Sequence, residues 1–156
     1  MSAREPHPPR TPSGRRVAAK VLHRVETDGA WATKMIDVEL SRARLPPSES
    51  GRAADLVYGS LRSLRSVDRA IDAHCTKKGA LEPLARAALR VAAFELLFTA
   101  APAHAVVSEA VALVKRERSE GLARFVNAVL RRIADARDPT PRPRSLDLPD
   151  WVMAEL

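Results

Sequence analysis

The segment LRVAAFELLF, residues 89–98, is apolar at eight of its ten positions and leaves almost no polar face on a helix. Such a helix is expected to run through the middle of a bundle rather than along its surface. Its neighbours must then be amphipathic. The segments PAHAVVSEAVALVK (residues 102–115) and FVNAVLRRI (125–133) fit this requirement, because their apolar residues recur at spacings of three and four. Helices are therefore predicted at about 84–100, 105–119 and 122–137.

Four further helices are expected upstream of this block. Ser13 is a candidate N-cap for a first helix that Gly29 ends. A second helix is expected at about 31–44, a third beginning at Ser48, and a fourth with Ser66 as its cap. No alternating β-branched run with turn signals occurs, so the predicted fold class is all-α. The residues predicted to be buried are Leu89, Phe94, Leu97, Val111, Phe125 and Val129.

The two ends of the chain differ in composition from its middle. Residues 1–12 contain four prolines and two arginines, which predicts a disordered basic arm. Residues 138–156 begin as a proline-rich linker and continue into LPDWVMAEL, which starts to look helical. We expect one folded domain at 13–137, followed by a linker and the start of a further segment. That segment either belongs to a longer protein or docks loosely as the C-terminus of this one.

Composition narrows the classes of function. The chain has 156 residues, enough for one domain with a core and too few for that domain plus a standard catalytic domain. Its formal charge of +7, from 26 Lys and Arg against 19 Asp and Glu, favours a polyanionic partner. The alternative is that these charges only solvate exposed faces. A single cysteine excludes an internal disulfide and a Cys-based zinc site, and we expect a cytoplasmic protein with no export signal or membrane span.

The sequence contains no pattern typical of catalysis. Its six glycines are scattered, so a glycine-rich loop for S-adenosylmethionine or for phosphate is absent. Cys75 lacks a catalytic motif around it and is expected to be a small, partly buried side chain. His104, Ser108 and Glu109 lack the spacing of a triad or a metal site, and Glu109 is expected to be a buried or half-buried hydrogen-bond partner. We predict no catalytic residue, no metal site and no cofactor in this chain.

The helical block, together with LVYGSLR (residues 56–62), resembles the NusB-type RNA-binding domain. It is closest to the version at the N-terminus of the Sun/Fmu (RsmB) small-subunit rRNA cytosine-5 methyltransferases. The resemblance covers about residues 13–137, and its second half carries the more specific motifs. It implies a bundle of about seven helices, arranged as two packed three-helix subbundles, that binds RNA.

The resemblance also implies where RNA would bind. In NusB-like domains an arginine-rich segment at the start of the first helix meets single-stranded RNA, and the matching positions here are Arg10, Arg15, Arg16, Lys20 and Arg24. A planar guanidinium suits phosphate because it offers two parallel, charge-assisted hydrogen bonds. The alternative is that these cations only solubilise an exposed helix start.

A second basic set, Arg124, Arg131 and Arg132, lies in the last predicted helix. Arg124 and Arg131 are seven residues apart and so return to the same helix face. The chain has only two Trp, one Tyr and three Phe, and the Phe residues fall on apolar faces. Because base stacking needs exposed rings, RNA binding is expected to rely on phosphates and shape, with modest sequence specificity.

Three functions are consistent with these patterns. The preferred hypothesis is an rRNA-recognition module of a Sun/Fmu-type methyltransferase, whose catalytic domain and S-adenosylmethionine lie outside this chain. The main alternative is a free-standing NusB-type transcription antitermination factor that binds an rRNA leader together with a ribosomal protein. The third is a helical oligomerisation module whose basic residues are only solvated.

Overall fold

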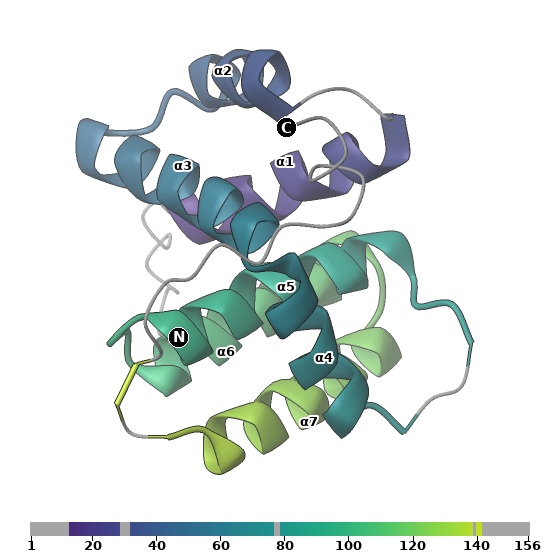
Figure 1. The fold of residues 1–156 in the computed structure, drawn as a ribbon. Coiled ribbons are helices and arrows are strands. Elements are labelled where there is room, and N and C mark those ends of the chain that lie inside the picture. Colours follow the sequence, from purple (N-terminus) through teal and green to yellow (C-terminus); the bar gives the residue numbers. More distant parts are fainter. Residues whose placement is uncertain (1–12, 29–31, 77–78, 139, 142–156) are drawn as a thin grey trace, which may run out of the picture.

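The computed structural model describes residues 13–28, 32–76, 79–138 and 140–141. Within these ranges the chain forms seven α-helices and no strand, which confirms the all-α prediction (Figure 1). The helices are α1 (Gly14–Asp28), α2 (Ala32–Ala43), α3 (Pro47–Arg62), α4 (Leu64–His74), α5 (Pro83–Phe98), α6 (Ala103–Glu117) and α7 (Glu120–Ala136).

The helices form two groups, which confirms the expected pair of three-helix subbundles. In the first group α1, α2 and α3 contact one another; in the second, α5, α6 and α7 do the same, with α4 packed against α5 and α7. The central helix α5 contacts both groups (Figure 1). Contacts with α1, α3, α4, α6 and α7 surround it, so its largely apolar sequence has a partner on every side.

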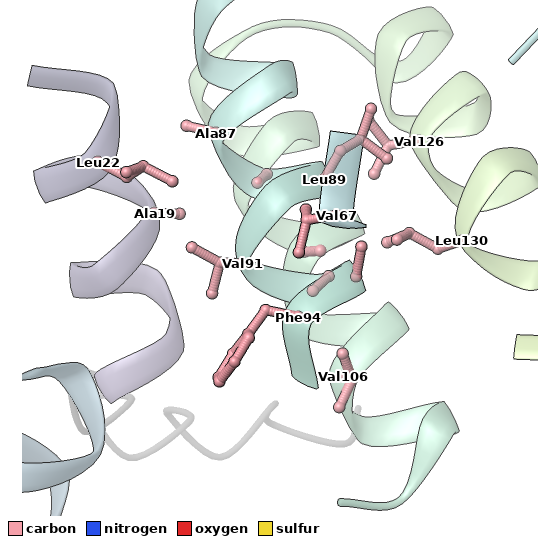
Figure 2. Packing of buried hydrophobic residues seen from close by; sticks show 14 of the residues in the cluster. Ala19, Leu22, Val67, Ala87, Leu89, Val91, Phe94, Val106, Val126 and Leu130 are labelled. Carbon is pink, nitrogen blue, oxygen red and sulfur yellow. The ribbon is translucent and has the colours of Figure 1, made fainter. Parts of the chain in front are cut away.

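The core is centred on α5. Every residue of this helix from Leu84 to Phe98 is buried except Arg86. Figure 2 shows the side chain of Val91 on the α1 side of the helix and that of Leu89 directed toward α7. Of the residues predicted to be buried, Val111 and Phe125 are only partly buried against the core. The others are buried as predicted, namely Leu89, Phe94, Leu97 and Val129.

Two helix starts differ from the prediction. The third helix begins at Pro47 rather than Ser48, and proline suits the first position because that backbone nitrogen has no helical partner. The fourth helix follows the third after the single residue Ser63, so Ser63 rather than Ser66 takes the N-cap position. Gly29, the predicted arm at 1–12 and most of the predicted linker lie outside the described residues.

An ion-pair cluster around the buried Arg90 connects the two groups. Arg90 of α5 donates from Nε and Nη2 to the carboxylate of Asp68 in α4, at 2.7 and 2.8 Å, and it also pairs with Glu26 of α1. Burial acts to lower the pKa of Arg90, but its hydrogen bonds to Asp68 and the charge of Glu26 raise that pKa overall. Arg90 therefore stays charged inside the fold and connects α1, α4 and α5.

Candidate nucleic-acid interface

The start of α1 is held in place by contacts from three directions. The Ser13 hydroxyl oxygen accepts from the Arg16 backbone N–H at 3.2 Å, which confirms the predicted N-cap. The same hydroxyl donates to Glu109 of α6 at 3.2 Å, and the Gly14 N–H donates to Glu49 of α3 at 2.7 Å. A Cβ at Gly14 would lie only 2.6 Å from the Glu49 carbonyl oxygen, so glycine permits this close approach.

Arg15 is directed into the protein. Its guanidinium donates to both carboxylate oxygens of Glu95, at 2.7 and 3.0 Å, and to Glu109 at 3.2 Å. The exposed fraction is 14% for the Arg15 side chain and 6% for that of Glu95. The hydrogen bond with Glu95 is the main reason why the pKa of Arg15 is raised. Of the residues expected to meet RNA, Arg15 is thus already paired with two carboxylates of the protein.

Lys20 and Arg24 of α1 are exposed, and both pair with carboxylates. The Lys20 ammonium lies 3.3 Å from Glu117 Oε1, and this bond lowers the pKa of Glu117. Arg24 pairs with Glu39 of α2 and lies 3.7 Å from Asp28. Half-buried Arg16 lines a small cavity between α1, α5 and α6, and its Nε has no hydrogen-bond partner among the described residues. Arg10 lies outside the described residues.

The arginines of α7 are exposed, and none of them pairs with a carboxylate among the described residues. Arg131 donates from Nε to the side-chain oxygen of Asn127 at 3.3 Å, and Arg132 donates from Nη1 to the backbone oxygen of His74 at 3.1 Å. Arg124 forms no hydrogen bond or ion pair within the part of the chain that the structure describes. These three cations therefore keep an unneutralised positive charge.

The expected RNA-binding residues do not form one patch. Helix α1 contacts neither α4 nor α7, and Figure 2 shows α1 and α7 on opposite sides of α5. The basic residues of α1 and those of α7 are thus separate surfaces. Sequence reasoning missed Glu95 as a partner of Arg15. Its signal was a lone carboxylate in an apolar helix, since a buried charge requires a partner.

The residues considered for catalysis occupy ordinary structural places. Cys75 is half-buried at the end of α4, as predicted, and His104 is exposed in the first turn of α6. Glu109 is half-buried and bonded to Ser13 and Arg15, which confirms its expected role as a hydrogen-bond partner. Among the described residues, no helix has the length and apolar character to cross a membrane.

Comparison with known proteins agrees with the fold and with the sequence motifs. The NusB family model matches residues 12–135. Ribosomal RNA small subunit methyltransferase B of Thermus thermophilus is 40% identical over 138 residues, a match that covers 88% of this chain and 33% of that protein. The chain thus spans about a third of the length of this relative.

Antitermination proteins are similar as well. Transcription antitermination protein NusB of Aliarcobacter butzleri is 29% identical over 119 residues, which covers 74% of this chain and 90% of that protein. A chain in a crystal structure of antitermination factors NusB and NusE in complex with dsRNA superposes with a TM-score of 0.72 at 28% identity. That superposition covers 79% of this chain and 94% of the other. The resemblance drawn from the sequence motifs is confirmed.

Proposed function

We propose, from the premise that this chain belongs to the NusB family, that it is the RNA-recognition module of a small-subunit rRNA cytosine-5 methyltransferase. The observation that carries the proposal is the 40% identity to the Thermus methyltransferase across 88% of this chain. The match covers only a third of that protein, and methyl transfer is assigned to a domain outside these residues.

In this proposal the module binds RNA through its phosphates. Arg124, Arg131 and Arg132 offer guanidinium N–H groups that no carboxylate occupies among the described residues. Lys20 is half-exposed, and phosphate must compete there with the carboxylate of Glu117. Phosphate contacts position RNA without reading its sequence, so the module would hold rRNA while the catalytic domain selects the base.

The proposal assigns no cofactor to this chain. S-adenosylmethionine would be bound by the catalytic domain, because the six glycines of this sequence are dispersed and form no cofactor loop. The setting would be the cytoplasm, where rRNA is found. The role of this module is then to raise the local concentration of rRNA at a neighbouring active site.

A second candidate function is transcription antitermination by a free-standing factor. It is favoured by the match to the Aliarcobacter NusB protein, which covers 90% of that protein's length. In this case the RNA would be an rRNA leader, and a ribosomal protein would bind beside it. The two functions share the RNA-binding surface and differ in the RNA and the protein partner.

Binding experiments with two RNAs separate these functions. Fluorescence anisotropy would compare labelled fragments of small-subunit rRNA with an rRNA leader, each with and without the ribosomal protein partner of NusB. The methyltransferase module should bind the rRNA fragments, and the ribosomal protein should not increase its affinity for the leader. A leader complex strengthened by that protein would favour antitermination instead.

The reading frame provides an independent test. If the proposal is correct, the codons that follow position 156 encode a glycine-rich cofactor loop and paired cysteine motifs. A stop codon directly after position 156 would contradict the methyltransferase assignment and leave the antitermination factor as the better account.

A further inference from the structure

A groove lies where α4 and α7 run beside the end of α5. Its volume is about 210 Å³, enough for several water-sized groups. Helices α4 and α7 contact α5 but not α1. The groove is lined by residues of all three helices and of the chain just after α7, among them Arg69, His74, Leu97 and Arg137.

The polar lining of this groove is basic. Arg69, His74 and Arg137 supply its ionisable side chains, and the lining includes no Asp or Glu. Arg132 lies at its edge, since its guanidinium bonds to the backbone oxygen of His74 at 3.1 Å. A groove with several cations and no lining carboxylate concentrates positive potential, which attracts anions.

The arginines of the groove keep donors available. Arg137 donates from Nη1 to the Leu96 backbone oxygen at 3.1 Å, and Arg69 has no hydrogen bond or ion pair among the described residues. A guanidinium has five N–H donors, and a carbonyl oxygen does not neutralise its charge. This differs from α1, where Arg15 is bonded to two carboxylates.

We propose that this groove binds phosphates of the RNA backbone, as a second RNA contact on the opposite side of α5 from α1. The inference rests on the proposed RNA-binding function and adds a site built from residues that the sequence motifs did not indicate. Arg69 and Arg137 would each donate to a phosphate, and the edge residue Arg132 would extend the contact along α7.

A purely structural role does not account for all of these cations. Cations near a helix C-terminus stabilise its exposed carbonyls, and this describes Arg137 just after α7. Arg69 lies in the middle of α4 and forms no hydrogen bond or ion pair with another described residue. Arg69 is therefore the residue that best separates RNA binding from helix stabilisation.

The test compares charge-removing variants of the 156-residue chain. Binding of a short, fluorescein-labelled single strand of small-subunit rRNA would be measured by anisotropy between about 50 and about 200 mM salt. The groove variants are Arg69→Gln and the double variant Arg69→Gln/Arg137→Gln. The matched control is Arg42→Gln/Arg52→Gln, which removes the same charge from exposed arginines of α2 and α3 that lie near carboxylates.

The groove double variant should flatten the slope of log affinity against log salt by about 1.4, at about 0.7 for each lost phosphate contact, while the control changes it little. Arg69→Gln alone should flatten it by about 0.7, and it answers the question if Arg137→Gln unfolds the chain. RNA carrying 4-thiouridine should crosslink to peptides of α4 and of the end of α7.

Three results would contradict the proposal that the groove binds RNA phosphates. If the wild type binds RNA and the groove variants behave like the control, the groove is not an RNA site, and the proposed function still stands. Lost affinity for a ribosomal protein with unchanged RNA affinity would assign the groove to protein. No RNA binding by the wild type at low salt would contradict the proposed function and the groove together.

Discussion

At the scale of single residues, Gly59 explains why LVYGSLR carries a glycine inside a helix. A Cβ at this position would lie 2.2 Å from Cζ of Phe94, whose ring is fully buried. Helices α3 and α5 therefore approach each other closely where this glycine faces the Phe94 ring. The ring also stacks with Phe98 at a centroid distance of 5.5 Å, so it has little room to move aside.

Replacing Gly59 by alanine should destabilise the fold by about 1–3 kcal/mol, because the added methyl group overpacks the core against the Phe94 ring. The measurement is urea unfolding. Gly51→Ala is a matched control in the same helix, since a Cβ there meets nothing within 4 Å. The control should gain about 0.5–1 kcal/mol from helix propensity. Equal stability of the two variants would contradict the close packing.

Arg15 illustrates a residue whose role was not evident from charge alone. It lies three positions before Ala18 and seven before Leu22, so it falls on the buried stripe of α1. That spacing was a usable signal for a buried arginine. Its partner Glu95 is 80 residues away in the chain, and local periodicity does not indicate such a pairing. A resemblance to an RNA-binding segment placed Arg15 with the exposed cations.

Arg15→Ala should destabilise the protein by about 3 kcal/mol, because it leaves the carboxylate of Glu95 buried and unpaired. Arg42→Ala is the matched control. Its side chain is 69% exposed, and the loss should be below about 0.5 kcal/mol. Unfolding by urea measures both variants. An Arg15→Ala protein as stable as the control, with weakened RNA binding, would show that Arg15 serves RNA rather than the fold.

At the scale of helices, carboxylates of neighbouring helices pair with the accessible cations of α1. Glu117 at the end of α6 binds Lys20, and this bond lowers the pKa of the carboxyl group. An RNA phosphate that approaches Lys20 must replace this partner and is repelled by its charge. We therefore expect the carboxylates packed beside α1 to weaken any RNA binding by this surface.

Glu117→Gln should consequently raise RNA affinity several-fold at low salt, since Lys20 then loses a competing anion and one phosphate contact becomes favourable. Glu120→Gln changes the net charge equally and lies in an exposed pair with Lys115, so it serves as the control. Anisotropy with single-stranded rRNA measures the effect. If both variants raise affinity by the same factor, only net charge matters and Lys20 has no special role.

Glu82 connects the start of α5 with the end of α6. Its carboxylate accepts from the Ala85 N–H at 2.8 Å and from Arg118 Nε at 2.7 Å. Burial acts to raise the pKa of Glu82, but the hydrogen bonds from Arg118 and Ala85 lower it overall. A carboxyl group whose pKa is lower in the folded state stabilises the fold at pH values above its ordinary pKa of 4.5.

That stabilisation should be lost as the pH falls below 4.5 and through the lower pKa of the folded state. The urea midpoint of the wild type should therefore decrease across this range. Glu82→Gln should lower the midpoint at neutral pH and reduce its decrease in acid. The exposed pair at Glu120 supplies the control, since Glu120→Gln should keep the wild-type pH profile. A Glu82→Gln profile parallel to that of the wild type would contradict this assignment.

At the scale of the whole molecule, apolar periodicity predicted the helices, and the resemblance to the NusB-type domain implied their two groups. Within the part of the chain that the structure describes, seven helices form, because the apolar stripe of each packs into the shared core around α5. Errors were confined to features that depend on neighbours. The third helix begins at Pro47 instead of Ser48, and the N-cap of the fourth is Ser63 instead of Ser66. Val111 and Phe125 are only partly buried against the core.

The candidate interface was less predictable than the fold. Sequence spacing indicated which cations share a helix face. It also placed the two basic sets on different helices, α1 and α7. It did not indicate which cations have carboxylate partners, since these partners come from distant helices such as α5 and α6. Whether a cation is paired depends on the tertiary structure. Among the described residues, α7 and α4 carry cations that pair with no carboxylate, which makes these helices better candidates for RNA contact than α1.

The salt dependence of RNA binding by the unmodified chain tests the central claim most directly. Anisotropy with single-stranded small-subunit rRNA would be recorded between about 50 and about 200 mM salt. If roughly four phosphates are neutralised, log affinity should fall against log salt with a slope near −3, a loss of roughly 50-fold. Salt-independent binding, or no RNA binding at low salt, would contradict a module that holds rRNA through its phosphates.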